Sequence, residues 1–226
     1  ALAEAEVEYK DHTSSSIYVG FPIETSPHAF LKGARAVIWT TTPWTLPGNR
    51  AIAYSPELEY VLLQVNGKED DRLVAIGQNL LIAKDLLESV TKNIGITDYK
   101  ILETLKSNQL QGTIASHPLR GQGYDFDVPL LPGDHVTADA GTGLVHTAPG
   151  HGVEDFGVGK TYGLELPRTV SEDGTYYPHV PLFAELHVYK ANAPVIEKLK
   201  EVGSLLNEDK ILHSYPHSWR SKTPLI

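Results

Sequence analysis

The sequence of 226 residues contains no cysteine and no methionine. Without cysteine the chain cannot form a disulfide, bind zinc through thiolates or use a cysteine nucleophile. It also has no run of about 20 apolar residues, which a membrane-spanning helix would need, and no signal peptide at its start. These absences predict a cytoplasmic protein without a membrane partner. A chain that opens with Ala1 and lacks methionine is also expected to be a piece of a longer protein.

Positive charge is scarce as well. Nineteen Lys and Arg stand against 28 Asp and Glu, which gives a formal net charge of −9. This balance argues against a module that holds nucleic acid by charge alone, so any RNA would have to be delivered in another way. The remaining composition, with 41% hydrophobic residues, is that of a folded globular protein. The sequence shows no repeat and no clear linker, which predicts a single domain over residues 1–226.

Most of the predicted regular structure is β. Alternating or continuous apolar runs predict strands over residues 6–21, 34–39 and 60–65, and short strands separated by glycines and prolines over residues 100–146. Asn79 is expected to cap a helix that ends at Gly95, and a second helix is expected over residues 193–202, with Pro194 in its first turn and Gly203 after its end. We therefore predict an α+β fold centred on a β-barrel, with a few packed helices and chain ends that lie close together.

Three consecutive threonines, Thr40 to Thr42, follow the strand predicted at residues 34–39 and begin a segment broken by Pro43, Pro47 and Gly48. Because successive side chains point to opposite faces, at least one hydroxyl points to each face, and one face of the loop can offer donors and acceptors to a ligand. The alternative is that these hydroxyls satisfy only the nearby backbone.

A second polar segment runs from Gly141 to Phe156. It consists of a glycine-rich turn, a strand that ends at His146, a Pro-Gly loop and an acidic pair that opens a short helix. This order brings His146 and Asp155 near each other. The alternatives are a core histidine with satisfied nitrogens and a carboxylate that only stabilises the helix N-terminus. A metal site of His146, His151 and Asp155 is a third option, which the loop spacing disfavours.

The end of the chain, from Lys210 to Ile226, carries basic residues and no acid. Such a tail is able to contact a phosphate backbone, or it is a solvated return strand. Ser218 and Ser221 offer no zinc ligand.

Taken together and in this order, these segments resemble the editing domain of isoleucyl-tRNA synthetases, called connective peptide 1. The resemblance rests on residues 1–9, 39–49, 141–156 and 213–224, including the stretches Trp39-Thr40-Thr41-Thr42-Pro43-Trp44 and His213-Ser214-Tyr215-Pro216-His217. The valyl and leucyl relatives differ in both polar segments, so the isoleucyl branch is the better match. The departures are Gly48, where alanine is common, Leu144, and the two serines in place of cysteines.

The resemblance implies hydrolysis of valine wrongly attached to isoleucine tRNA, and of valyl-adenylate. A non-catalytic module that binds the amino acid or the aminoacyl-adenosine is the alternative. The implied partners are the acceptor end of the mischarged tRNA and the rest of the synthetase in cis, for a monomer. No cofactor or metal is implied for editing, although the parent enzyme would use ATP and magnesium.

The same resemblance implies roles for individual residues. Asp155 would bind the α-ammonium group of the substrate, and His146 would limit the size of the amino-acid pocket. The implied catalytic residues are Thr41, Thr42, His146 and Asp155, and the implied substrate-binding residues are Trp39, Thr40, Asn49, Thr147 and His151.

Overall fold

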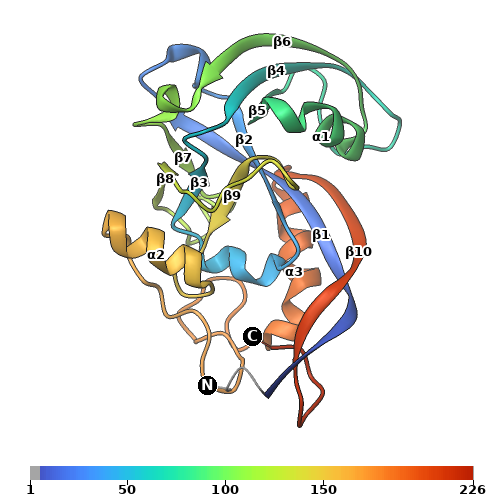
Figure 1. Cartoon of the computed structure of the whole chain (residues 1–226), viewed down its shortest axis with the longest axis vertical. Coiled ribbons are helices and arrows are strands. Elements are labelled where there is room, and N and C mark those ends of the chain that lie inside the picture. The colour runs from blue at the N-terminus through green and yellow to red at the C-terminus, as the bar shows by residue number, and fades with distance from the viewer. Residues whose placement is uncertain (1–5, 226) are drawn as a thin grey trace.

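A computed structural model describes residues 6–225 (Figure 1). Its strands are β1 (Val7–Thr25), β2 (Arg35–Thr40), β3 (Ala51–Tyr54), β4 (Glu59–Lys68), β5 (Asn79–Ala83), β6 (Ile96–Lys106), β7 (Ile114–Ser116), β8 (Asp127–Pro132), β9 (Leu144–Thr147) and β10 (Leu205–Ser218). Its α-helices are α1 (Leu87–Ile94), α2 (Val153–Tyr162) and α3 (Val188–Glu201), and short 3₁₀ helices are η2 (Ala29–Leu31), η3 (Pro43–Gly48), η4 (Lys84–Leu86) and η5 (Ser107–Leu110).

All of these strands belong to one sheet, and β1 is its organising strand. The strand order is β6-β4-β5-β2-β1-β7-β8-β3-β9, with β10 also paired to β1. About the first two thirds of β1, up to Val19, form a long antiparallel ribbon with β10 along its whole length, starting with Val7 opposite Ser218. Further along, β1 pairs with β2 and β7. The ribbon brings the two ends of the described chain together, as the sequence predicts.

The sheet curls back on itself beside β9. The Ala83 amide at the end of β5 donates to the carbonyl of Thr142, just before β9, at 2.8 Å. The Tyr60 hydroxyl from β4 donates to the Gly143 carbonyl, also at 2.8 Å. These bonds join parts of the sheet that lie far apart in the strand order, which confirms an α+β fold centred on a barrel-like sheet.

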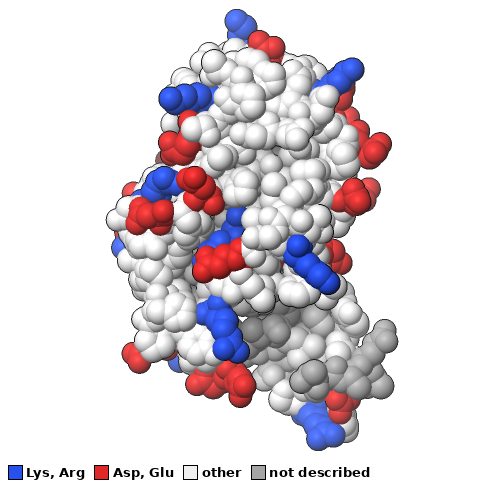
Figure 2. Space-filling model, turned by 90° about the vertical axis from the view of Figure 1, so that its left-hand side faces the viewer, with Lys and Arg blue, Asp and Glu red and all other residues white. Residues whose placement is uncertain are grey.

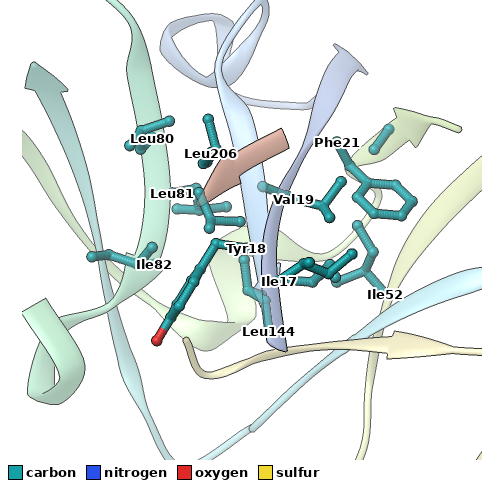
Figure 3. Packing of buried hydrophobic residues seen from close by; sticks show 14 of the residues in the cluster. Ile17, Tyr18, Val19, Phe21, Ile52, Leu80, Leu81, Ile82, Leu144 and Leu206 are labelled. Atoms are coloured by element: carbon teal, nitrogen blue, oxygen red, sulfur yellow. The ribbon is translucent and has the colours of Figure 1, made fainter. Parts of the chain in front are cut away.

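The core lies inside the curled sheet, where side chains from β1, β2, β3, β5, β9 and β10 meet (Figure 3). Ile17, Val19 and Phe21 of β1 are fully buried and alternate with residues that face the other side of the strand. Leu80, Leu81 and Ile82 of β5 are also fully buried. A strand with consecutive buried residues is covered on both faces, which makes its sequence indistinguishable from that of a buried helix.

The prediction of a helix that starts at Asn79 is therefore wrong in its first half, because a run of buried apolar residues fits either a strand or a helix. Residues 79–83 form β5, and η4 then leads into α1. The expected stop is confirmed, because Gly95 ends α1 with a φ of 81°.

The helix expected over residues 193–202 is α3, which begins earlier, at Val188. His187 caps it, with its Nδ1 accepting the Tyr189 amide at 3.2 Å, and this places Pro194 inside the helix rather than in its first turn. The basic tail forms the end of β10, up to Ser218, as a return strand paired with β1. Its contact with a phosphate backbone stays a prediction. Within residues 6–225, no helix is long and apolar enough to cross a membrane.

Candidate active site

The threonine segment joins the end of β2 to η3 and borders a cleft of about 160 Å³. Thr40 is 8% exposed, and its Oγ1 accepts the Thr42 amide at 3.1 Å. Thr41 and Thr42 are half-buried and line the cleft. No hydrogen-bond partner within residues 6–225 takes the Thr41 hydroxyl. The Thr40 hydroxyl is therefore bonded to the nearby backbone, whereas the Thr41 hydroxyl is available to a ligand.

His146 lies behind this segment, on β9. Its Nδ1 accepts from Asn49 Nδ2 at 2.8 Å, so the ring proton resides on Nε2, which donates to Thr45 Oγ1 at 3.0 Å. The Thr45 hydroxyl in turn donates to the carbonyl of Thr42 at 2.9 Å. Burial lowers the pKa of His146 to about 3, and the nearby His117 and His151 add to the effect. The ring is thus neutral, with both nitrogens engaged, and it links β9 to the threonine segment.

Asp155 lies in the first turn of α2, which begins after Gly152. Its Oδ2 accepts the amide of Ala148 at 2.8 Å, which fixes the Pro-Gly loop against the helix start. Burial raises the pKa of Asp155, whereas the Ala148 amide and the nearby His135 act to lower it. A half-buried carboxylate with a raised pKa gains from a cationic ligand.

His151 packs against the same segment from the Pro-Gly loop. Its ring meets Trp44 edge-on, with 5.1 Å between the centroids, and its Nε2 lies 2.7 Å from Thr169 Oγ1. Burial lowers the pKa of His151 to about 4. A Cβ at position 48 would come within 3.0 Å of the His151 ring, so Gly48 makes room for the histidine.

The remaining predicted residues lie elsewhere or are enclosed. Asn49 and Thr147 are fully buried, and the Thr147 hydroxyl donates to Val145 of its own strand. Trp39 donates to Ser16 Oγ and borders a different hollow, of about 360 Å³. Thr41 lies after the end of β2, where the chain has left the strand, so strand alternation does not place it beside Trp39. The structure thus places Trp39 apart from the cleft that Thr41 and Thr42 line, and its role in substrate binding stays a prediction.

The cleft also holds residues that the sequence analysis did not assign to a site. They come from β1, η3, α3 and the end of the chain: His12, Ser14, Trp44, Val188, Tyr189, Asn192, Tyr215, Pro224 and Leu225. Of the predicted residues, Thr41 and Thr42 line the cleft, and His146 and Asn49 lie behind it. Tyr215 and Trp44 belong to the motifs quoted above, but no local pattern marks Asn192 or His12.

His146, His151 and Asp155 are the residues that the sequence offers as a third option, a metal site. Among residues 6–225, no group of three or more His, Cys, Asp or Glu side chains is arranged to hold a metal ion. Both nitrogens of His146 already have protein partners.

Comparisons with known proteins agree with this architecture. No family model matches the chain. It is 49% identical over 239 residues to the isoleucine–tRNA ligase of Gluconobacter oxydans, 49% over 235 residues to that of Haemophilus influenzae and 47% over 226 residues to that of Bacillus cereus. Each match covers 100% of the chain but only 23–25% of the relative, so the chain spans about a quarter of their length.

A solved structure described as GlLeuRS-CP1 has the same fold. It superposes with a TM-score of 0.60 at 12% sequence identity and covers 85% of this chain and 99% of its own. Over its whole length the chain is therefore homologous to a segment of isoleucine–tRNA ligases, and it has the fold of a connective peptide 1 editing domain.

Proposed function

We propose that this chain is an editing hydrolase that removes valine from mischarged isoleucine tRNA, with valyl-adenylate as a second substrate. The chemical need for such an activity is clear. Valine differs from isoleucine by one methylene, which changes binding by only about 1–3 kcal/mol, and this synthetase is the standard example of the problem. A second pocket that admits valine and excludes isoleucine would remove the errors.

The observation that carries the proposal is the Thr41 hydroxyl, which borders the cleft and has no hydrogen-bond partner among residues 6–225. In the proposed reaction, water attacks the ester carbonyl, the carbonyl oxygen gains negative charge, and the terminal ribose oxygen leaves with a proton. The hydroxyls of Thr41 and Thr42 would orient the water or stabilise the developing oxyanion. Deleting one such donor typically slows a reaction by about 10²–10³-fold.

His146 does not line the cleft but is connected to Thr42 through Thr45. Because its Nδ1 already accepts from Asn49 and its Nε2 donates to Thr45, the ring has no lone pair left to take a proton from water. We therefore assign it a role in shaping the amino-acid pocket, through Thr45 and the Thr42 carbonyl that Thr45 holds.

Asp155 would bind the α-ammonium group of valine. A charge-assisted contact of this kind would fix the orientation of the substrate. The raised pKa of the carboxyl supports the assignment, because burial without a cation leaves the charged form poorly stabilised. Its bond to the Ala148 amide would keep the carboxylate in place while the ligand binds.

Delivery of the tRNA would depend on the rest of the synthetase. The chain carries a net charge of −9. On the face shown in Figure 2, Lys and Arg side chains are interspersed with Asp and Glu, and no broad basic surface is visible. In the full-length enzyme the tRNA body would be held elsewhere, and tethering would supply the local concentration of the acceptor end.

The proposal is tested by incubating the chain with labelled Val-tRNA(Ile) and with Ile-tRNA(Ile) and measuring the released amino acid against spontaneous hydrolysis. We expect release of valine and little release of isoleucine. The rate of valine release should fall by about 10²-fold in Thr41→Ala and in Thr42→Ala. Thr97→Ala, an exposed change on β6, is the matched control. Binding of a valyl-adenosine analogue without release of valine would instead identify a non-catalytic binding module.

We further propose that hydrolysis needs no cofactor of its own. Prolonged treatment with a zinc chelator, with magnesium kept present for tRNA folding, should leave the rate of valine release unchanged. Loss of activity that added zinc restores would contradict both this proposal and the assignment of Asp155 to the ammonium group.

A further inference from the structure

Both backbone polar groups of Trp44 form hydrogen bonds with side chains from outside the barrel-like sheet. Its amide donates to Oδ1 of Asn192 at 3.1 Å, and its carbonyl accepts from the Tyr176 hydroxyl. Asn192 lies in α3 and Tyr176 in the segment between α2 and α3, so both partners come from a later part of the chain. Trp44 is the second residue after Thr42, and the anchor therefore acts next to the hydroxyls that border the cleft.

The other hydrogen bonds of the segment from Thr41 to Trp44 lie inside the loop. The amide and the hydroxyl of Thr45 both donate to the Thr42 carbonyl at 2.9 Å, and the Thr42 amide donates to Thr40 Oγ1 at 3.1 Å. The Thr42 hydroxyl lies 3.3 Å from Thr40 Oγ1 and 3.4 Å from Thr45 Oγ1. Asn192 itself lines the same cleft as Thr41 and Thr42. Its bond to Trp44 thus ties α3 to the threonine segment, and both border the cleft.

We propose that Asn192 is a positioning residue for editing: its side-chain oxygen fixes the Trp44 amide and so holds Thr41 and Thr42 in the geometry that hydrolysis requires. This inference rests on the proposed function and extends it to a residue on α3. Displacement of a catalytic segment by about 1 Å can cost about 100-fold in rate, so one bond at this place has a large effect.

The position of Asn192 agrees with such a role. Asparagine is an unfavourable residue inside a helix, and alanine is the most favourable. Asn192→Ala therefore removes the acceptor for Trp44 but improves the helix, and the two effects on stability oppose each other. We expect its melting temperature to stay within about 3 °C of the wild type, as for a change of about 1 kcal/mol in a domain of this size.

The test compares Asn192→Ala with Asn192→Asp, which keeps an acceptor oxygen at the same place, and with Glu197→Ala, an exposed change on the same helix. Single-turnover hydrolysis of Val-tRNA(Ile) should slow by about 10- to 100-fold in Asn192→Ala. It should recover to within about threefold of the wild type in Asn192→Asp and stay unchanged in Glu197→Ala. Amide hydrogen exchange at Trp44, followed by NMR, should be about tenfold faster in Asn192→Ala alone.

Each outcome separates this inference from the proposed function. If the wild type releases valine and Asn192→Ala matches its rate, or if Asn192→Asp is as slow as Asn192→Ala, Asn192 does not position the threonines. Unchanged exchange at Trp44 in Asn192→Ala overturns the anchor itself. If the wild type releases no valine, the proposed function fails and the catalytic role of Asn192 fails with it, whereas faster exchange at Trp44 would still establish the anchor.

Discussion

One oxygen of Asp155 is bonded to the Ala148 amide, and this allows the charge of the residue to be tested apart from its structural bond. Asp155→Asn keeps an acceptor for Ala148 but cannot form an ion pair with an ammonium group. We expect deacylation of Val-tRNA(Ile) to fall by about 10- to 100-fold, which corresponds to about 1.5–3 kcal/mol for a bond to a charged group. The melting temperature should not fall, because the variant no longer buries a carboxylate.

The pH dependence provides a second test of Asp155. Since burial raises its pKa, the carboxyl takes up a proton at a higher pH than an ordinary aspartate. Valine release by the wild type should therefore decline as the pH falls through this raised pKa, and the decline should be absent in Asp155→Asn. An identical pH profile in both proteins, or a fall in stability that accounts for the lost activity, would assign Asp155 a structural role.

His146 is expected to exclude isoleucine by its volume. In His146→Ala the pocket behind Thr45 and Asn49 opens, and the variant should begin to hydrolyse correctly charged Ile-tRNA(Ile). It should also be less stable, because Thr45 and Asn49 each lose one hydrogen bond, worth about 0.5–1.5 kcal/mol, while each keeps another. Asn49→Ala removes one of these bonds but leaves the ring, so it controls for the loss of stability. Loss of valine hydrolysis with no gain for isoleucine would show that the ring does not set specificity.

At the scale of elements, the close approach of β5 and β9 requires a glycine at position 143. Gly143 has a φ of 74°, and a Cβ there would lie 2.2 Å from that of Ala83. Gly143→Ala should therefore cost about 1–3 kcal/mol for overpacking, in addition to about 1–2 kcal/mol for the left-handed backbone.

Gly203 provides the matched control for this prediction. It follows α3 with a φ of 68°, and a Cβ there would meet nothing within 4 Å. Gly203→Ala should cost only the backbone contribution of about 1–2 kcal/mol. Urea unfolding of both variants measures the difference. Equal losses would show that the contact between Gly143 and Ala83 does not limit closure of the sheet.

At the scale of the whole molecule, two buried histidines, His117 and His146, and the half-buried His151 make stability depend on pH. Burial lowers the pKa of His117 and His146 to about 3 and that of His151 to about 4, whereas the unfolded chain titrates near 6.5. Between these values the unfolded state binds more protons, so the free energy of unfolding falls as the pH falls below about 6.5. At pH 5 the loss should approach 2 kcal/mol per histidine.

Urea unfolding at pH 7.5 and pH 5 measures this loss directly. NMR titration should show the His117 ring still neutral at pH 5, because its Nε2 donates to the Leu46 carbonyl and its Nδ1 accepts from the Leu119 amide. Equal stability at the two pH values, or a His117 ring that titrates near pH 6.5, would contradict the prediction.

Local patterns in the sequence determined those parts of the protein that depend on neighbouring residues. The break after β2 follows from Pro43 and Pro47, the end of α1 from Gly95, and the start of α2 from the acidic pair before Phe156. Alternation in β1 predicts a long strand, and the glycine-rich stretch before His146 predicts short ones. These features need only backbone preferences and side-chain periodicity, which act over a few residues.

The tertiary structure decided what depends on long-range contacts. The run Leu80 to Ile82 suits a helix or a strand until burial on both faces makes it β5. Trp39 and Thr41 are two residues apart and yet border different hollows. The bond between Trp44 and Asn192 joins residues 148 apart, and that between Thr45 and His146 residues 101 apart. Such pairs form only when the curled sheet and α3 bring them together, so no local pattern in the chain encodes them.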